Sequence, residues 1–181
     1  MQGSIFTAFS DMIIDQMGME KWNELLEKTN PSSGGVYTSG AQYEDSELIN
    51  MVVLLSEQTG IAVDDLIESF GTYVFDILYK NSGVDVSSID NLKDFLLAID
   101  NVIHVEVQRL YPNAYLPKFE YEEGNDGDLI MYYSSKRKLC AVSVGLIKGA
   151  SIKFKEPVTI SHPECMHHGA EKCKLIVKFD A

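Results

Sequence analysis

The stretch YYSSKRKLCAVSVGLIKG, residues 132–149, changes from one kind of secondary structure to another within a few residues. It begins inside a run, 128–134, whose aliphatic and aromatic side chains favour a β-strand. Between residues 137 and 148, Leu139, Val142 and Leu146 recur at the spacing of one helix face. The stretch therefore predicts a helix that directly follows a strand, as in an α+β fold.

The flanking sequence extends this pattern in both directions. Strands are predicted at 118–122 and 128–134, around the turn sequence GNDG, and again at 157–161 and 174–179. The first two thirds of the chain are predicted to be helical: an opening helix, then 20–28, 44–58, 64–79, 92–98 and a helix from 101 that ends near Pro112, with a turn-rich segment at 80–88. We expect one α+β domain over 1–181. Its helical part, about 1–115, packs on a mostly antiparallel sheet with an inserted helix, about 116–181.

Charge and composition narrow the function. The chain has 15 basic and 27 acidic residues, which gives a net charge of −12, and 45% of its 181 residues are hydrophobic. An acidic globular domain is a poor match for nucleic acid or for an anionic membrane surface, so neither is expected as a partner. The opening residues lack the basic segment of a signal peptide and the three cysteines are an odd number, so we expect a cytoplasmic protein.

His104 is the first candidate for chemistry. It lies at the edge of an apolar stripe in the predicted helix NVIHVEVQRLYP. Such a histidine is often a core residue that is hydrogen-bonded to a neighbour. A neutral imidazole on an apolar helix is also the usual axial ligand of haem iron. The sequence around His104 leaves both interpretations open.

A second candidate is the spaced motif Tyr133, Ser135 and Arg137. Alternate residues of a strand point to the same face, so all three side chains are expected on one face if the strand extends that far. Two hydroxyls and a guanidinium suit one or two carboxylates. Together with His104, the motif indicates a ligand that carries both a metal and carboxylates, as haem does with its propionates.

These motifs resemble those of H-NOX proteins, the haem nitric oxide/oxygen-binding domains related to the haem domain of soluble guanylate cyclase. The resemblance spans essentially the whole chain. Its residues are MQGSIF at the start, His104, the P-x-A-x-x-P pattern of 112–117, YYSSKRK, and GLIKG at 145–149. It implies the H-NOX fold, with a haem b group between the helical part and the sheet.

The resemblance also implies a role for each site residue. His104 is the implied proximal ligand of the haem iron, and Tyr133, Ser135 and Arg137 are the implied clamps on the propionates. Pro117 is implied to press on the porphyrin and distort it. The implied distal wall consists of Ile5, Phe9, Val74, Leu78, Val142 and Leu146.

Val142 bears on which gas the protein binds. The resemblance aligns it with the position where oxygen-binding H-NOX proteins carry a tyrosine that donates a hydrogen bond to O₂. Bound O₂ becomes superoxide-like, so such a donor stabilises it by about 1–3 kcal/mol, while NO gains far less. We expect a sensor that binds NO and CO and excludes O₂, although the nine tyrosines of the chain leave a donor from another position open.

The resemblance implies a switch and a partner. NO weakens the bond trans to itself, so the Fe–His104 bond would weaken or break, and the helical part would then shift against the sheet. The sequence shows no effector domain, so we expect signalling by contact with a histidine kinase of a two-component system or a cyclic-di-GMP enzyme.

The cysteines form a third candidate site. Cys140, His162, Cys165 and Cys173 make a Cys₃His set, which suits structural Zn²⁺. Three buried, inert thiols are the alternative, and His167 and His168 are alternative imidazoles. The resemblance favours zinc, which some H-NOX relatives carry on matching residues. Oxidation of such thiolates would add a redox input.

Two other classes of protein compete with the sensor. A haem enzyme such as a peroxidase would also use a proximal histidine, but it needs a distal acid–base group, and the implied distal wall is aliphatic. A zinc-stabilised module without haem could use Tyr133, Ser135 and Arg137 for a small carboxylate. We expect the sensor, without catalysis.

Overall fold

The structure, a computed structural model, describes residues 1–83 and 89–180. Its helices and strands fall where the sequence predicts them, within about three residues at each end, except that the helix predicted at 137–148 continues to residue 154. Residues 84–88 of the predicted turn lie outside the described part. The helices are α1 (Gly3–Met17), α2 (Met19–Thr29), α3 (Asp45–Thr59), α4 (Val63–Asn81), α5 (Leu92–Ala98), α6 (His104–Leu110) and α7 (Cys140–Phe154). The strands are β1 (Lys118–Glu123), β2 (Leu129–Ser134), β3 (Val158–Glu164) and β4 (Cys173–Phe179). In the described residues, no helix is long and apolar enough to cross a membrane.

The four strands form one antiparallel sheet in the order β1-β2-β4-β3. On β2, residues 129, 131 and 133 are buried, in the alternation of a strand with one covered face. Tyr133 stands opposite Phe119 of β1 on one side and Cys173 of β4 on the other. The register therefore brings one residue of each candidate site, the propionate clamp and the cysteine cluster, into adjacent strands.

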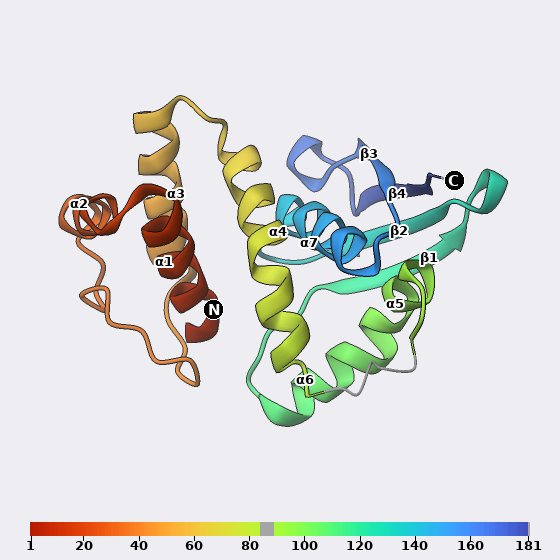
Figure 1. Ribbon diagram of the computed structural model, residues 1–181, viewed down its shortest axis with the longest axis horizontal. Helices are drawn as coiled ribbons and strands as arrows, with labels where there is room; N and C mark the ends of the chain where they lie inside the picture. Colours follow the sequence, from red (N-terminus) through yellow and green to blue (C-terminus); the bar gives the residue numbers. More distant parts are fainter. Residues whose placement is uncertain (84–88, 181) are drawn as a thin grey trace.

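Helices α1, α2 and α3 lie on one side of α4, and α7 and the sheet lie on the other (Figure 1). The interior divides accordingly into two hydrophobic clusters. The first, here the helical cluster, joins α1, α2 and α3 to the beginning of α4; its largest buried side chains include Phe6, Phe9, Ile13, Leu25, Met51 and Leu55. The second, here the sheet cluster, joins the sheet to α5, α7 and the end of α4; it includes Phe75, Leu92, Leu96, Met131, Tyr133 and Leu175. The boundary between the two clusters therefore lies along α4, whereas the change from helices to strands lies near residue 115.

Helices α4 and α7 touch backbone to backbone. A Cβ atom on Gly71 would lie 2.5 Å from the carbonyl oxygen of Val142, and one on Gly145 would overlap the carbonyl oxygen of Glu68. Glycine is required at both positions because of this close approach. It brings α7 against both clusters, and Leu146 packs on each of them.

Candidate haem and metal sites

His104 begins α6 directly after a single π-helical turn, Ile99–Ile103. The His104 backbone N–H closes that turn on the carbonyl oxygen of Ile99. The side chain of His104 is 17% exposed, and its Nδ1 lies 3.4 Å from Oδ1 of Asp100. This contact commits Nδ1, so Nε2 is the nitrogen available to a metal.

Burial sets the protonation state of His104. Desolvation lowers the pKa of the imidazole, although Asp100 acts in the opposite direction. The ring is therefore neutral at pH 7, which is the form that binds iron. The donor set fits a haem ligand: a neutral imidazole, oriented by a carboxylate, with one nitrogen free.

Two residues that the sequence analysis did not single out surround His104. Asp100 Oδ1 also accepts a hydrogen bond, at 3.2 Å, from the backbone N–H of Phe119 in β1. The ring of Phe119 lies 6.0 Å from that of His104 and 5.7 Å from that of Tyr133, between centroids. An aspartate four residues before a helical histidine is a readable signal for the first of them. The contact with β1 has no such signal.

The expectation that Tyr133, Ser135 and Arg137 share one strand face is wrong. β2 ends at Ser134, and the chain turns at 135–138, where the N–H of Lys138 donates to the carbonyl oxygen of Ser135 at 3.2 Å. The turn places Lys138 in the left-handed region, at φ +52°. The hydroxyl of Ser135 accepts from the N–H of Arg137 at 3.2 Å, which stabilises the turn.

Because of the turn, Arg137 reaches partners far from β2. Its Nε donates to Oδ2 of Asp45, the first residue of α3, at 2.5 Å. One terminal nitrogen donates to the carbonyl oxygen of Tyr115 at 2.8 Å, and the guanidinium lies 4.9 Å from the centre of the Tyr115 ring. Arg137 therefore has a carboxylate partner within the protein, and its remaining N–H groups are available to a ligand.

The other two residues of the candidate clamp, Tyr133 and Ser135, are buried. Tyr133 is 2% exposed within the sheet cluster. Burial raises the pKa of its phenol to about 12, although hydrogen bonds with Ser135 and with the backbone of Leu139 lower it. Tyr133 is therefore a neutral donor at pH 7.

Tyr115 was missed by the sequence analysis, yet its hydroxyl accepts from the N–H of Lys136 at 2.8 Å and so holds the turn from the other side.

The six predicted distal residues lie together. Phe9 and Val74 are each 1% exposed within the helical cluster, and the other four are partly buried against it: Ile5, Leu78, Val142 and Leu146. All six are apolar, as a haem wall requires. Pro117 is half-buried, directly before β1. The side chains fit haem on both sides: a nitrogen donor and hydroxyls near the sheet, and hydrocarbon on the helices.

The cysteine cluster is compact. The ligand atoms of Cys140, His162, Cys165 and Cys173 all lie within 4.8 Å of one another. The sulfur of Cys165 is 3.8 Å from that of Cys140 and 3.9 Å from that of Cys173. A tetrahedron with Zn–S bonds of about 2.3 Å has edges of about 3.8 Å, whereas a disulfide brings sulfurs to about 2.05 Å. The separations fit the edges of such a tetrahedron and are too long for a disulfide.

His162 completes this donor set. Its Nε2 is buried and has no hydrogen-bond partner among the described residues. Burial lowers the pKa of His162 and raises the pKa of the Cys140 and Cys173 thiols. A buried, neutral, unpaired imidazole nitrogen is costly unless a metal takes it up. In contrast, Nε2 of His167 lies 2.7 Å from the carbonyl oxygen of Lys138, so the structure places this alternative imidazole against backbone.

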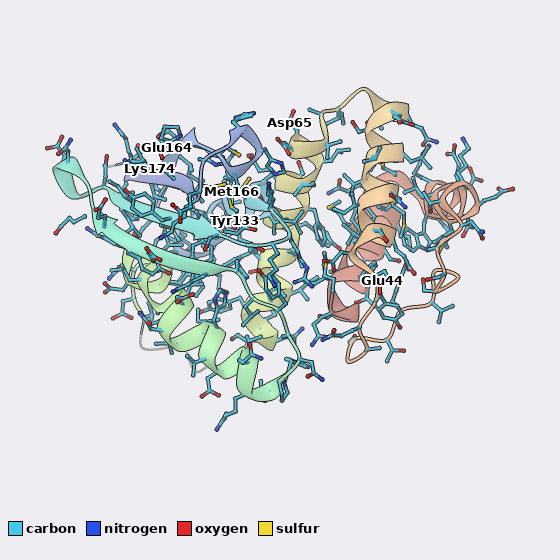
Figure 2. The ribbon with its side chains drawn as sticks, turned by 180° about the vertical axis from the view of Figure 1, so that it is seen from behind. Glu44, Asp65, Tyr133, Glu164, Met166 and Lys174 are labelled. Carbon is cyan, nitrogen blue, oxygen red and sulfur yellow. The ribbon has the colours of Figure 1, made fainter. Side chains whose placement is uncertain are left out.

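The two sites are neighbours in space and in sequence. Figure 2 shows Tyr133 and Met166 near each other on the sheet side of the molecule, with Glu44, just before α3, on the helical side. The N–H of Met166 donates to the sulfur of Cys173 at 3.2 Å. An α+β domain with apolar residues on its helices, a half-buried imidazole, and hydroxyl and guanidinium groups that are candidates for binding propionates fits the class of haem-binding domains.

Comparisons with known proteins agree with this class. The family model for Haem-NO-binding domains matches residues 2–162. The fold matches the crystal structure of an H-NOX protein from S. oneidensis in its Fe(II)NO state, with a TM-score of 0.93 and 35% identity over 100% of both chains. It also matches an NMR structure of an H-NOX domain from Shewanella oneidensis in the Fe(II)CO state, with a TM-score of 0.87 and 35% identity over 99% of each chain.

The chain belongs to the Haem-NO-binding, or H-NOX, family. Domains of this family bind haem and act as gas sensors rather than as enzymes. A curated relative, soluble guanylate cyclase gcy-32 of Caenorhabditis elegans, is 27% identical over 155 residues, which is 82% of this chain and 22% of the relative. The chain therefore spans about a fifth of the length of the curated relatives that it matches.

Proposed function

We propose that this protein is a cytoplasmic sensor that binds NO and CO at a ferrous haem b, excludes O₂, and regulates a signalling partner. His104 is the proximal ligand, Tyr133, Ser135 and Arg137 clamp the propionates, and Pro117 distorts the porphyrin. The observation that carries the proposal is the neutral, half-buried His104, with Nδ1 committed to Asp100, in a fold whose helical wall is entirely apolar.

The exclusion of O₂ rests on the absence of a hydrogen-bond donor at Val142, the third residue of α7. Three tyrosines pack against the helical cluster, and two of them already donate: Tyr37 to Glu47 at 3.1 Å and Tyr73 to Asp15 at 2.9 Å. The third, Tyr43, accepts from the N–H of Thr38 at 2.8 Å, which keeps its hydroxyl at that loop. These engagements support an apolar pocket, in which O₂ gains no hydrogen bond.

The switch uses the connection between His104 and the sheet. His104 would hold the haem iron, and ferrous haem would supply the site at which NO and CO bind; binding of NO would weaken the bond between the iron and His104. His104 would then be released, and α6 with its π turn would be free to move relative to β1. The helical cluster would shift against the sheet cluster, and the partner would read the difference between the two arrangements.

We also propose structural Zn²⁺ on Cys140, His162, Cys165 and Cys173. Cys140 is the first residue of α7, and the other three come from β3, the loop after it and the first residue of β4. Zinc would therefore fix the beginning of α7 to the sheet, three residues after Arg137. Its thiolates are also open to oxidation, which would release the metal and supply a second, redox input.

The curated relatives are named soluble guanylate cyclases, so an effector that responds to the haem domain is the model. We propose a histidine kinase of a two-component system or a cyclic-di-GMP enzyme. With a net charge of −12, the sensor suits a partner that presents a basic surface.

Absorption spectroscopy of the purified ferrous protein tests the proposal. We expect a Soret band that shifts with NO and with CO and is unchanged in air. A colourless protein, or a stable spectrum of an O₂ complex, would contradict it. His104→Gly should lose the Fe–His bond and, in a partner assay, should behave as the NO-bound wild type does. If it behaves as the unliganded protein, signalling by bond rupture is wrong.

A further inference from the structure

Asp100 occupies an unusual place between the proposed iron ligand and the sheet. Its Oδ1 atom alone meets both Nδ1 of His104, at 3.4 Å, and the backbone N–H of Phe119, at 3.2 Å. His104 begins α6, and Phe119 is the second residue of β1. One carboxylate oxygen therefore joins the helix that carries the ligand to an edge strand of the sheet.

The backbone places Asp100 for this contact. Asp100 lies inside the π turn Ile99–Ile103, where each hydrogen bond spans one residue more than in an α-helix. Single π turns concentrate at functional sites. The turn leaves Asp100 half-buried, with its side chain 24% exposed and facing His104 from the preceding turn.

The chemistry of this contact favours a specific role. A carboxylate that accepts from Nδ1–H fixes the tautomer in which Nε2 carries the lone pair, and it makes that lone pair more basic. A more basic imidazole makes a stronger bond to iron. The Phe119 N–H shares the same oxygen, and Phe119 stands opposite Tyr133 in the sheet. A change at His104 is thus passed to the strand next to the propionate clamp.

We infer that Asp100 is a positioning residue that sets how firmly His104 holds the iron and connects the release of His104 to strand β1. This inference rests on the proposed role of His104 as proximal ligand. It adds that the threshold for release is set by a residue that acts through His104.

Two variants separate the parts of this role. Asp100→Asn keeps an oxygen that can accept from Phe119 and from Nδ1–H but removes the negative charge. Asp100→Ala removes both contacts. Glu106→Gln is the matched control, because Glu106 also lies on α6 and loses a charge, but its partner is Arg109, at 2.9 Å.

Resonance Raman spectroscopy of the ferrous holoprotein gives the primary readout. The Fe–His stretching band should move to lower frequency in Asp100→Asn and further in Asp100→Ala, and stay in place in Glu106→Gln. Loss of haem to an excess of a haem-scavenging globin should accelerate on the order of 10-fold in Asp100→Ala, the lower end of the effect of removing such a supporting contact. If Asp100→Ala does not fold, the band of Asp100→Asn decides.

The outcomes distinguish this inference from the proposed function. An unchanged Fe–His band in both Asp100 variants overturns the inference. It does so even if the midpoint of urea unfolding falls, because a loss of stability alone would mean that Asp100 has only a structural role. His104→Gly, measured beside them, tests the proposed function itself. If His104→Gly retains the wild-type band, His104 is not the ligand and both proposals are wrong.

Discussion

Arg137 and Asp45 are 92 positions apart in the chain, yet Nε of Arg137 lies 2.5 Å from Oδ2 of Asp45. Asp45 begins α3 in the helical half, and Arg137 lies in the turn that joins β2 to α7. The second oxygen of Asp45 lies 2.8 Å from the ammonium group of Met1. Arg137, the cation proposed to bind a propionate, is thus itself bound by a carboxylate at the beginning of α3.

Asp45→Asn should loosen this connection. The pair is partly exposed, so we expect a loss of about 1 kcal/mol in the free energy of unfolding, measured by urea denaturation at pH 7. Burial would raise the pKa of Asp45, but Arg137 and the ammonium group outweigh it and lower the pKa. The contribution is therefore present above the ordinary carboxyl pKa and disappears as the pH falls through the depressed one. Asp65→Asn, an exposed position in the first turn of α4, should leave stability within about 0.5 kcal/mol of wild type.

Val142→Tyr should create O₂ binding. A phenol at this position of α7 would donate to the superoxide-like oxygen, and a charged acceptor makes that bond worth about 1.5–3 kcal/mol. We expect O₂ affinity to rise on the order of 10–100-fold, measured by O₂ titration of the ferrous protein. Val142→Phe supplies the same ring without the hydroxyl. An equal gain in Val142→Phe would show that pocket shape, rather than hydrogen bonding, controls O₂.

The proposed zinc site predicts that zinc content depends on His162. Reduced wild-type protein should contain about one zinc ion per chain by metal analysis, since a Cys₃His set is complete for a structural site. His162→Ala should lower that zinc content and the melting temperature. His168→Ala removes an exposed imidazole of the same loop and should change neither. Haem iron without zinc in the reduced wild type would refute the site.

Glu47 predicts sensitivity to acid in the helical half. This carboxylate is 7% exposed and accepts hydrogen bonds from Ser32, Ser33 and Tyr37, the closest at 2.6 Å. Burial would raise the pKa of Glu47, but these hydrogen bonds outweigh it and lower the pKa. A lowered folded pKa stabilises the protein above about pH 4.3, and this stability is lost as the pH falls through the folded value.

Glu47→Gln should therefore cost about 2 kcal/mol at pH 7, and the difference from wild type should shrink below about pH 4. Unfolding by urea at a series of pH values measures both effects. Glu44→Gln, an exposed neighbour, should follow the wild-type curve at every pH. A constant difference across that pH range would mean that Glu47 contributes through packing alone.

Sequence patterns predicted the parts of the site that lie in short segments with strong local signals. The α5 boundaries match the apolar spacing, and His162 and Cys165 form a local chelating pair that the structure joins to Cys140 and Cys173. Contacts between distant segments were not predictable in this way. Asp45 meets Arg137 only because a turn at 135–138 ends β2, and no period in the sequence marks a position of positive φ at a lysine.

The π turn before His104 determines where the imidazole points. A π turn contains one residue more than an α-helical turn, and each residue of an α-helix rotates the side chain by about 100°. With one residue fewer between α5 and α6, the His104 side chain would be rotated by about 100° about the helix axis. It would then point away from Asp100 and from strand β1. The extra residue of the π turn thus determines the direction of the imidazole. Deleting one residue of 99–103 other than Asp100 would change that direction, although His104 and Asp100 would both remain in the chain.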